Sequence, residues 1–466
     1  MGLPALQFEV HGSVENARSL VHEAVDIWFD QVATLFKDGQ EPTISELSHQ
    51  FSDTRGDLMG AVMQSMVEKA YHHHLHQEYA PCPECARIFK RKRFDSKTLS
   101  TLHGEFTLDR PYFFCTRCKI GFHPLDDVLV IAPERHQHDV QKKAVKSASR
   151  MPFEESAEEF SSLTGVEIGN HFQHDTLNAV GDVSTLELVI PDRSEIERRI
   201  DVAAKSTKSK PILVVGTDGA HMPTRPKAGR KGKRGPGEWK EAKGFRLYVV
   251  GDKGRTIQIA SWHQIQEAES FKKDLAVIAE RIPHDRVRVA LLADGAEYLW
   301  STMTECFPTG RPILDFYHCA EYVHDVAKIL FGEGELKTKQ WAEAIMSMLS
   351  FSEMDDVLSI LRDMEPKTPI ASEKIRKMIG YLEKNQGRIH YETDKDDGYP
   401  IGSGGIESSH KYVCHTRMKR SGAWWVKESG NSMLRVRCAV VNGTYDRIFE
   451  HYATQSRRSR LRLVDK

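Results

Sequence analysis

Short runs of aliphatic residues that end at an aspartate recur three times in the hydrophobic pattern of the chain. The runs and their aspartates are Ile212–Val215 with Asp218, Val287–Ala293 with Asp294, and Pro312–Leu314 with Asp315. Aliphatic and β-branched runs of this length predict strands that are buried on both faces of a sheet. Their recurrence predicts one sheet that delivers its acids to a common edge, with Asp218 at or just past the end of the first strand.

The segments around these runs predict the rest of that sheet. Alternating patterns at Phe245–Val250 and Thr256–Ala260, joined by Gly251–Gly254, predict a tight hairpin. Helical periodicity follows at residues 267–281, 296–306 and 318–331. The order β-β-β-α-β-α-β-α describes an α/β, RNase H-like core with a mixed five-stranded sheet and helices. The first and fourth strands are neighbours in that arrangement, so Asp218 and Asp294 are expected to meet.

Helical patterns dominate the remaining chain. We expect helices over residues 13–37 and 43–78, and an all-α insertion over residues 332–398. Residues 134–190 divide into three helical pieces, and the last two outline a helix-turn-helix around Gly165. Any helical hairpin has this outline, and the first helix of the pair is acidic. Both a DNA-binding and a purely structural role therefore stay open for this region.

Two Cys-x2-Cys pairs lie between these helical regions. The pairs are Cys82/Cys85 and Cys115/Cys118, with 29 residues between them. Each such turn points two thiolates at one centre, and two turns together complete a tetrahedral sulfur site for zinc. Alternating residues between the pairs predict the hairpin of a zinc ribbon. Four thiolates leave no position for a substrate, so the expected Zn²⁺ is structural. Unpaired core cysteines would rarely fall into two such pairs.

These changes of pattern divide the chain. The predicted segments are an N-terminal helical region (1–79), a zinc ribbon (80–130), a helical domain with a connector (131–206), the first part of the core (207–331), the all-α insertion (332–398), the final core helix (399–450) and a basic tail (451–466). The run of Arg457, Arg458, Arg460 and Arg462 in the tail predicts a disordered arm that contacts phosphates.

Composition excludes secreted and membrane proteins. The 466 residues are 40% hydrophobic and 28% charged. They contain no apolar run of the about 20 residues that a membrane span requires. The start of the chain lacks the pattern of a secretory signal, which predicts a cytoplasmic protein whose cysteines are reduced.

The net charge of −1 conceals a segregation of charge along the chain. Residues 1–80 contain 4 basic and 12 acidic residues, whereas residues 201–260 contain 14 and 5, and residues 401–466 contain 13 and 5. Basic segments beside the aspartate strands predict DNA as a partner. The expected DNA-binding residues are Arg225, Lys227, Arg230, Lys231, Lys233 and Arg234 of one glycine-rich loop, and Lys411, Arg417, Lys419 and Arg420 near the end of the chain.

Asp218, Asp294 and Glu407 are the candidate catalytic residues. Glu407 opens a helix after the glycine-rich turn of residues 399–405. Phosphoryl transfer on DNA needs an activated nucleophile and stabilisation of the developing charge, which two Mg²⁺ or Mn²⁺ ions supply. Carboxylate oxygens are the ligands that such ions prefer. We expect Asp218 to bridge the two ions, with Asp294 and Glu407 on one ion each. Each acid alone also fits an ordinary turn or helix start.

These residues and their surroundings resemble a known family. The set Asp218, Asp294, Asp315-Phe-Tyr-His318, Tyr399-Pro-Ile-Gly-Ser-Gly-Gly-Ile-Glu407 and Arg417-Met-Lys419 is similar to the DDE transposases of bacterial insertion sequences, in particular to the ISKra-type branch, which is related to the Mutator-like group. The segments Arg110–Cys118 and Gly121–Asp126 resemble the N-terminal ribbon of the same branch. The resemblance implies that Asp218, Asp294 and Glu407 are catalytic metal ligands. It also implies supporting roles near the site for Asp315 and His318.

The sequence therefore predicts a DNA transposase that cuts transposon ends and joins the 3′ hydroxyl to target DNA by two-metal-ion phosphoryl transfer. Its partners would be double-stranded DNA, as terminal inverted repeats and target, and further copies of the chain in a homodimer or larger synaptic assembly. The predicted location is the nucleoid region of a bacterial cytoplasm. The alternatives are a structure-selective RNase H-like nuclease without strand joining, and an inactive DNA-binding protein derived from a transposase.

Overall fold

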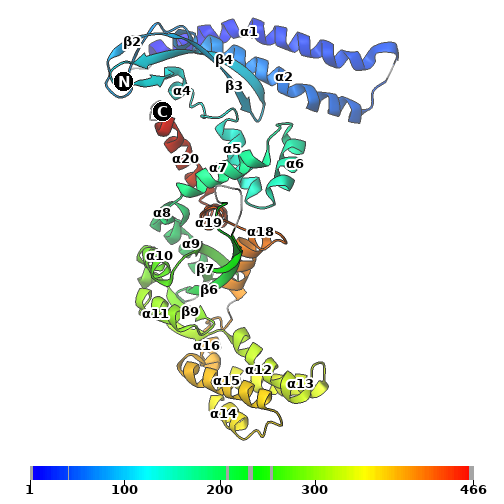
Figure 1. The fold of residues 1–466 in the computed structure, drawn as a ribbon, viewed down its shortest axis with the longest axis vertical. Helices are drawn as coiled ribbons and strands as arrows, with labels where there is room; N and C mark the ends of the chain where they lie inside the picture. Colours follow the sequence, from blue (N-terminus) through cyan, green and yellow to red (C-terminus); the bar gives the residue numbers. More distant parts are fainter. Residues whose placement is uncertain are drawn as a thin grey trace. The chain divides into compact units, whose positions relative to one another are not determined.

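The computed structural model describes residues 4–39, 41–205, 209–228, 235–251, 255–402 and 404–460. The chain forms two compact units (Figure 1). We call residues 1–183 and 449–466 the cysteine unit, and residues 184–448 the sheet unit. The predicted helical segment 131–206 is divided between them, because its last part belongs to the sheet unit. No helix among the described residues is both long and apolar enough to span a membrane.

The cysteine unit begins with a helical hairpin. It comprises α1 (Pro4–Ala33), η1 (Thr34–Gly39), α2 (Ile44–Ala70) and α3 (His72–Leu75). Thr43 and Glu46 form a capping box at the start of α2, in which each side chain bonds the backbone N–H of the other residue. The indole N–H of Trp28 donates to Thr54 Oγ1 at 2.9 Å and joins the two long helices. The predicted N-terminal helices are therefore present.

Short strands follow and bring the cysteine pairs together. They are β1 (Tyr79–Pro81), β2 (Ile88–Lys90), β3 (Arg93–Thr101), β4 (Gly104–Cys115) and β5 (Ile120–Phe122), with the short helix α4 (Pro124–Val128) after them. β3 and β4 form the predicted antiparallel hairpin, and β5 pairs with the end of β4. The buried Arg110 of β4 donates to both carboxylate oxygens of Asp126, which fixes α4 beside the hairpin.

Three helices follow in the chain before the sheet unit begins. They are α5 (His138–Ala148), α6 (Phe153–Thr164) and α7 (Asn170–Asp182). Their shared core contains Val140, Ala144, Ala157 and Phe160. The three predicted helical pieces are confirmed, and the turn around Gly165 separates the last two.

The C-terminal end differs from the prediction. Residues 451–460 were expected to belong to a disordered basic tail, but α20 (Tyr445–Arg460) is helical. Phe449 and Tyr452 explain the difference, because both are buried and both pack edge-on against His138 of α5. The arginine run therefore starts inside an anchored helix, while Arg462 lies outside the described residues.

A mixed five-stranded sheet forms the centre of the sheet unit, as predicted. Its strands are β6 (Ile212–Thr224), β7 (Glu238–Val250), β8 (Thr256–Ile265), β9 (Arg288–Ala293) and β10 (Arg311–Leu314). They lie in the order β10-β9-β6-β7-β8. β7 is antiparallel to both β6 and β8, whereas β9 is parallel to β6 and to β10. The neighbours of the first strand are thus the second and the fourth, which is the predicted arrangement.

β6 is longer than the sequence predicts. Asp218 was expected at or just past the end of the strand, and it lies in the middle of 13 residues. The Asp218-Gly219 pair has turn chemistry, but its backbone continues the ladder with β7, where Asp218 lies opposite Gly244. The predicted loop of residues 225–240 is correspondingly shorter, because β7 begins at Glu238.

Helices cover both faces of this sheet. The remaining elements are α8 (Leu186–Val189), α9 (Arg193–Ala204), α10 (Ala268–Arg281), η3 (His284–Arg286), α11 (Glu297–Cys306), α12 (Phe316–Phe331), α17 (Gly404–Ser409), the π-helix η5 (His410–His415), α18 (Thr416–Met418) and α19 (Lys427–Asn442). Phe245 packs on Phe271 of α10, and Thr217 contacts Met303 of α11, so these helices share one face. Gly216 and Asp218 face α17 and η5 on the other.

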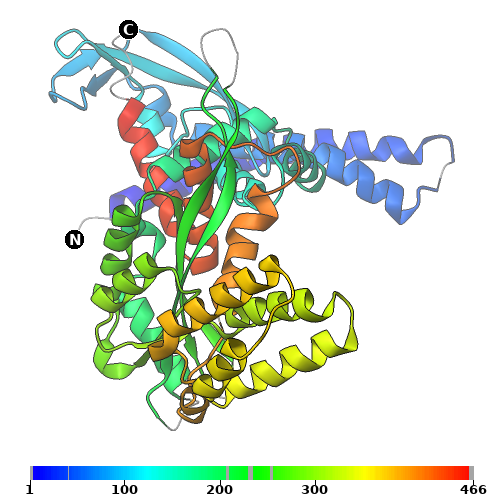
Figure 2. The same cartoon turned by 60° about the horizontal axis from the view of Figure 1, so that its bottom comes forward.

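The predicted all-α insertion is present as a group of helices that follows α12 (Figure 2). Its elements are α13 (Leu336–Ser350), α14 (Met354–Arg362), α15 (Pro369–Asn385), η4 (Gln386–Arg388) and α16 (Tyr391–Asp396). Tyr322 of α12 stacks on Tyr381 of α15 with ring centroids 4.2 Å apart. Arg311 of β10 forms ion pairs with Asp394 in α16 and with Asp397 just after it, and these pairs connect the end of the insertion to the sheet.

The edge strand β8 is closed by two asparagines of α19. The amide of Asn442 accepts from the Ser261 N–H at 2.7 Å and donates to the Ser261 carbonyl at 2.9 Å. Asn431 makes the same pair of bonds with Ile265, at 2.8 and 3.2 Å. Each side chain thus replaces the peptide group of a missing neighbouring strand. An uncovered sheet edge invites pairing with other chains, so this arrangement protects the core.

Replacing Asn442 with alanine should destabilise the sheet unit by at least about 2 kcal/mol, because each buried group left without a partner costs about 1–3 kcal/mol. Urea unfolding measures this change. Asn178→Ala on α7, whose amide contacts the half-exposed His174 ring, is the control and should change stability by less than about 1 kcal/mol. Equal unfolding of the wild type and Asn442→Ala would contradict the role of this asparagine.

Candidate active site and cysteine metal centre

Asp218 lies on β6 with both carboxylate oxygens engaged. Oδ1 accepts the backbone N–H of Gly219 at 2.7 Å, and Oδ2 lies 3.0 Å from His410 Nδ1. Burial raises the pKa of Asp218, but the hydrogen bond and charge of His410, the Gly219 N–H and the charge of His318 outweigh it. The pKa of Asp218 therefore lies below its ordinary value, and the residue is a carboxylate at neutral pH.

Asp294 follows β9 and begins the turn into α11. Its Oδ1 accepts the Ala296 N–H at 3.1 Å, and its carbonyl accepts the hydroxyl of Tyr381 at 2.9 Å. β9 is in register with β6 as far as Leu292 opposite Gly216. Asp218 and Asp294 each come two residues after this last pair. The predicted neighbourhood of these strands is present, and the insertion supports the Asp294 turn through Tyr381.

The pKa of Tyr298 on α11 is raised above its ordinary value, and both aspartates contribute to the increase. Burial raises its pKa, and the carboxylates of Glu241, Asp294 and Asp218 raise it further. Its hydroxyl donates to Glu241 Oε1 at 3.0 Å, and Glu241 is also paired with Lys243. Tyr298, Glu241 and Lys243 were not among the predicted site residues. The period-two spacing of Glu241 and Lys243 on one strand was the only visible signal of this polar group.

Asp315 and His318 lie at the start of α12, after β10. Asp315 is 1% exposed and caps the helix, since its Oδ1 accepts the Tyr317 N–H at 2.9 Å. Its own N–H donates to the Ala293 carbonyl, one residue before Asp294. His318 is half-buried, lies 3.4 Å from Glu321, and its charge contributes to the lowered pKa of Asp218. Both residues thus adjoin the aspartate strands.

Glu407 belongs to the short helix α17, which contacts both β6 and β7. Ile406 packs over Gly216, where an added Cβ would lie 3.0 Å from the Ile406 Cβ. Arg246 of β7 donates to the Gly405 carbonyl at 2.5 Å. Glu407 is exposed, and it precedes His410, the partner of Asp218, by three positions. Glu407 is thus one turn before the residue that bonds Asp218.

The three acids do not form a tight cluster. Among the described residues, one group of three or more His, Cys, Asp or Glu side chains has all its ligand atoms within 4.8 Å of one another. That group is the four cysteines. Asp218, Asp294 and Glu407 are therefore more widely spaced than ligands that share one ion. A pair of ions about 4 Å apart tolerates a wider spacing. Binding of Mg²⁺ by these residues stays a prediction.

The predicted DNA-binding residues have different surroundings. Arg225, Lys227, Lys411, Lys419 and Arg420 are exposed or half-buried, whereas Arg230, Lys231, Lys233 and Arg234 lie outside the described residues. Arg417 is only 4% exposed, and its guanidinium lies 5.1 Å from the centre of the buried Trp425 ring. Contrary to the expectation of a surface residue, Arg417 packs inside the sheet unit, because the chain after η5 turns it toward Trp425.

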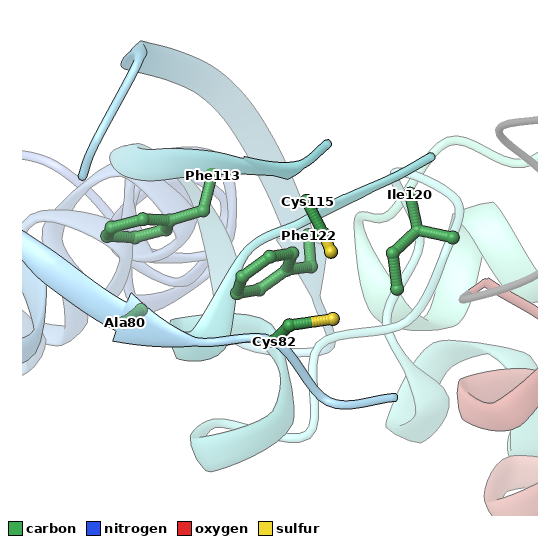
Figure 3. Close-up of a cluster of buried hydrophobic side chains, with 6 residues drawn as sticks. All are labelled: Ala80, Cys82, Phe113, Cys115, Ile120 and Phe122. Carbon is green, nitrogen blue, oxygen red and sulfur yellow. The ribbon is translucent and has the colours of Figure 1, made fainter. Parts of the chain in front are cut away.

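The four cysteine sulfurs of the cysteine unit converge as predicted. All four lie within 4.8 Å of one another, and those of Cys85 and Cys115 are 3.7 Å apart. Bonds of about 2.3 Å in a zinc tetrahedron correspond to sulfur separations of about 3.8 Å. Phe113 stacks on Phe122 with ring centroids 5.6 Å apart. Both rings belong to the same buried cluster as Cys82 and Cys115 (Figure 3).

The two cysteine turns have the same backbone geometry. Ala86 and Lys119, each just after a Cys-x2-Cys pair, both have φ 58°. Each donates its N–H to the carbonyl of the first cysteine of its pair, at 2.9 and 2.8 Å. Left-handed backbone at two non-glycine residues costs energy and persists only where the surroundings require it. Two matched turns around one point are the arrangement that a tetrahedral metal site needs.

The pKa values of Cys115 and Cys118 are shifted in opposite directions, because one thiolate disfavours the ionisation of its neighbour. Burial raises the pKa of Cys115, but the N–H of Cys118 and the neighbouring thiols bring it down to about 7. The hydrogen bond with Cys85 and burial raise the pKa of Cys118 to about 12. A divalent cation would remove this conflict by stabilising all four thiolates. The donor set and its spacing therefore suit Zn²⁺.

Fold and site together define a two-unit protein with a mixed α/β core, an aspartate-bearing sheet edge and a four-cysteine centre able to hold zinc. Residues 43–455 match the model of the Uncharacterised protein family (UPF0236), so the chain belongs to that family. No curated protein matches the chain. Among solved structures, the "Drosophila P element transposase strand transfer complex" is similar with 10% identity over 68% of this chain and 81% of that chain, and with a TM-score of 0.27.

Removal of zinc should selectively destabilise the cysteine unit. We expect one zinc per chain by elemental analysis, and a drop of at least about 10 °C in the melting midpoint after strong chelation, because such ions contribute several kcal/mol to folding. Cys85→Ser should behave like the chelated protein. Cys306→Ser, at a half-buried thiol on α11, is the control and should retain the metal. A metal-free wild type with an unchanged midpoint after chelation would contradict the zinc site.

Gly216→Ala should separate α17 from β6, because the new methyl group would press on Ile406. Overpacking of this kind costs about 1–3 kcal/mol, measurable by urea unfolding. The matched control is Gly380→Ala in α15, where an added Cβ meets nothing within 4 Å. This control should be neutral or stabilising by up to about 1 kcal/mol. A neutral Gly216→Ala would show that the contact does not hold the helix.

Proposed function

We propose that this chain is a DDE-type DNA transposase, of the bacterial insertion-sequence class that its motifs resemble, with an RNase H-like core. One observation carries the proposal: a helix far along the chain bonds the central strand beside the strand that ends at Asp294. His410, three residues after Glu407, bonds Asp218 itself. This contact supports the proposal that acids from three distant segments serve one site at the sheet.

The strand order supports the RNase H-like assignment. Three antiparallel strands are followed by two parallel ones on the far side of the first, and helices cover both faces. The acids belong to the first strand, the end of the fourth and a later helix. An all-α insertion separates the second acid from the third, as the resemblance implies. Asp315 and His318 support this edge from the start of α12.

Asp218, Asp294 and Glu407 would hold two divalent ions, Mg²⁺ or Mn²⁺, which when bound would activate the attacking oxygen and stabilise charge on the phosphate. The donor set suits these ions because it consists of oxygens alone. Asp218 also keeps a free lone pair on each oxygen beyond its bonds to Gly219 and His410. The exposed Lys411 lies next to this centre in sequence, where it would contact the DNA backbone.

Loss of one acid should abolish DNA cleavage. The substrate is a plasmid carrying the reading frame between its native flanking sequences, incubated with purified chain and Mg²⁺ or Mn²⁺. Asp218→Asn, Asp294→Asn and Glu407→Gln preserve shape and should lower cleavage and joining by about 10²–10⁴-fold, because the metal ions account for several kcal/mol. Asp363→Asn, at an exposed acid after α14, is the control and should act like the wild type.

Three outcomes separate the possible functions. Cleavage followed by joined product, lost in all three acid variants, supports a transposase. Cleavage without joined product in the wild type favours the nuclease. DNA binding without metal-dependent cleavage favours an inactive DNA-binding protein. Equal activity of the wild type and the acid variants would end the catalytic assignment.

Substitution of Lys411 should weaken DNA binding, whereas substitution of Arg417 should lower the stability of the fold. Lys411→Gln removes an exposed charge, so it should weaken binding equally for all sequences and reduce the slope of log affinity against log salt by about 1. Arg417→Gln removes a buried guanidinium beside Trp425, so it should lower the melting midpoint. Salt-titrated anisotropy and thermal unfolding distinguish them. A changed salt slope for Arg417→Gln alone would reverse this assignment.

A further inference from the structure

Asp218 is bonded by a buried histidine that no prediction included. The side chain of His410 is 5% exposed, and its Nδ1 lies 3.0 Å from Asp218 Oδ2. An ionised carboxylate only accepts hydrogen bonds, so His410 Nδ1 carries the proton and donates it. The other ring nitrogen, Nε2, is buried and has no hydrogen-bond partner among the described residues. The one hydrogen bond that the His410 ring makes among the described residues is therefore the bond to Asp218.

A second histidine holds the ring of His410 in place. His263 of β8 is fully buried and meets His410 edge to face, with ring centroids 4.9 Å apart. Burial moves the pKa of His263 well below its usual value, so the ring is neutral. Gly244 of β7 makes room for it, because a Cβ there would lie 2.1 Å from the His263 ring. This packing places a buried ring against His410 and restrains it.

The helix that carries His410 is also held in an unusual form. His410 is the first residue of the π-helix η5, and π segments leave backbone carbonyls out of the α-helical pattern. The guanidinium of Arg437 on α19 donates to the Val413 carbonyl at 2.6 Å and to the Tyr412 carbonyl. Arg437 is itself only 5% exposed. A buried side chain of a different helix thus stabilises the local geometry that begins at His410.

We propose that His410 is a positioning residue for Asp218, and that its Nδ1–H fixes the plane of this carboxylate toward the divalent ions. The inference rests on the proposed function. With Gly219 bonding Oδ1 and His410 bonding Oδ2, each oxygen has one donor from the protein and one remaining lone pair for a cation. Bonds of this kind behind a ligand commonly raise metal affinity by about 10–100-fold.

The test measures Mn²⁺ affinity of the full-length, zinc-loaded chain by electron paramagnetic resonance, without DNA. His410→Leu removes the donor and should weaken Mn²⁺ binding by about 10–100-fold. His410→Asn places an amide N–H near the position of Nδ1 and should restore the affinity to within about threefold of the wild type, since the same bond to Asp218 is possible. His415→Leu on the same π-helix is the matched control and should bind Mn²⁺ like the wild type.

Asp218→Asn separates failure of this inference from failure of the proposed function. If Asp218→Asn binds Mn²⁺ as tightly as the wild type, the metal site itself is wrong. If Asp218→Asn loses Mn²⁺ but His410→Leu does not, the positioning role is wrong while the function stands. An equal loss in His410→Leu and His410→Asn would assign the histidine a packing role and overturn the donor role.

A measurement on the wild type protects the test against a variant that does not fold. Nitrogen-15 spectra of the histidine rings, assigned by comparison with His410→Asn, should show His410 protonated on Nδ1. The opposite tautomer would place a lone pair against the Asp218 carboxylate, which is repulsive. Its detection would overturn the inference without any reference to DNA cleavage.

Discussion

The close contact between Gly216 and Ile406 is the constraint on which the candidate site depends. These residues are 190 positions apart in the chain. A side chain at Gly216 would push against the Cβ of Ile406 and lift α17 from the sheet. Glu407 and His410 both follow Ile406 on this helical segment. A missing side chain on the central strand therefore allows the helical segment that carries Glu407 and His410 to pack on the strand of Asp218 after the long helical insertion.

Two glycines on adjacent strands make room for neighbouring side chains on this face of the sheet. Gly216 accommodates Ile406, and Gly244, opposite Asp218 on β7, accommodates the His263 ring. Asp218 is the polar group left between them. Its carboxylate is bonded on the protein side by the Gly219 N–H and by His410. Rigid elements of this kind hold a site more closely than loops do.

Much of the core was predictable from local pattern, because strand composition and element order restrict the possible topologies. The five strands and the aspartate positions follow from runs such as Ile212–Val215. The length of β6 did not, since Asp218-Gly219 has the chemistry of a turn and only the partner strand shows that the ladder continues. The burial of Arg417 against Trp425 and the bond of His410 to Asp218 depend on long-range packing. No periodicity in the sequence reveals such contacts.

The histidine that bonds Asp218 stands in surroundings that stabilise charge poorly. A lysine or arginine in the same place would also bond the carboxylate, but its full charge 3 Å away would oppose a divalent cation on the other side. The buried, neutral His263 touches His410 and stands among packed groups that solvate charge poorly. The Nε2 atom of His410 is buried as well and has no hydrogen-bond partner among the described residues. Under the proposed function, the Nδ1–H of His410 would orient the acid and leave the remaining lone pairs of its oxygens for the divalent ions.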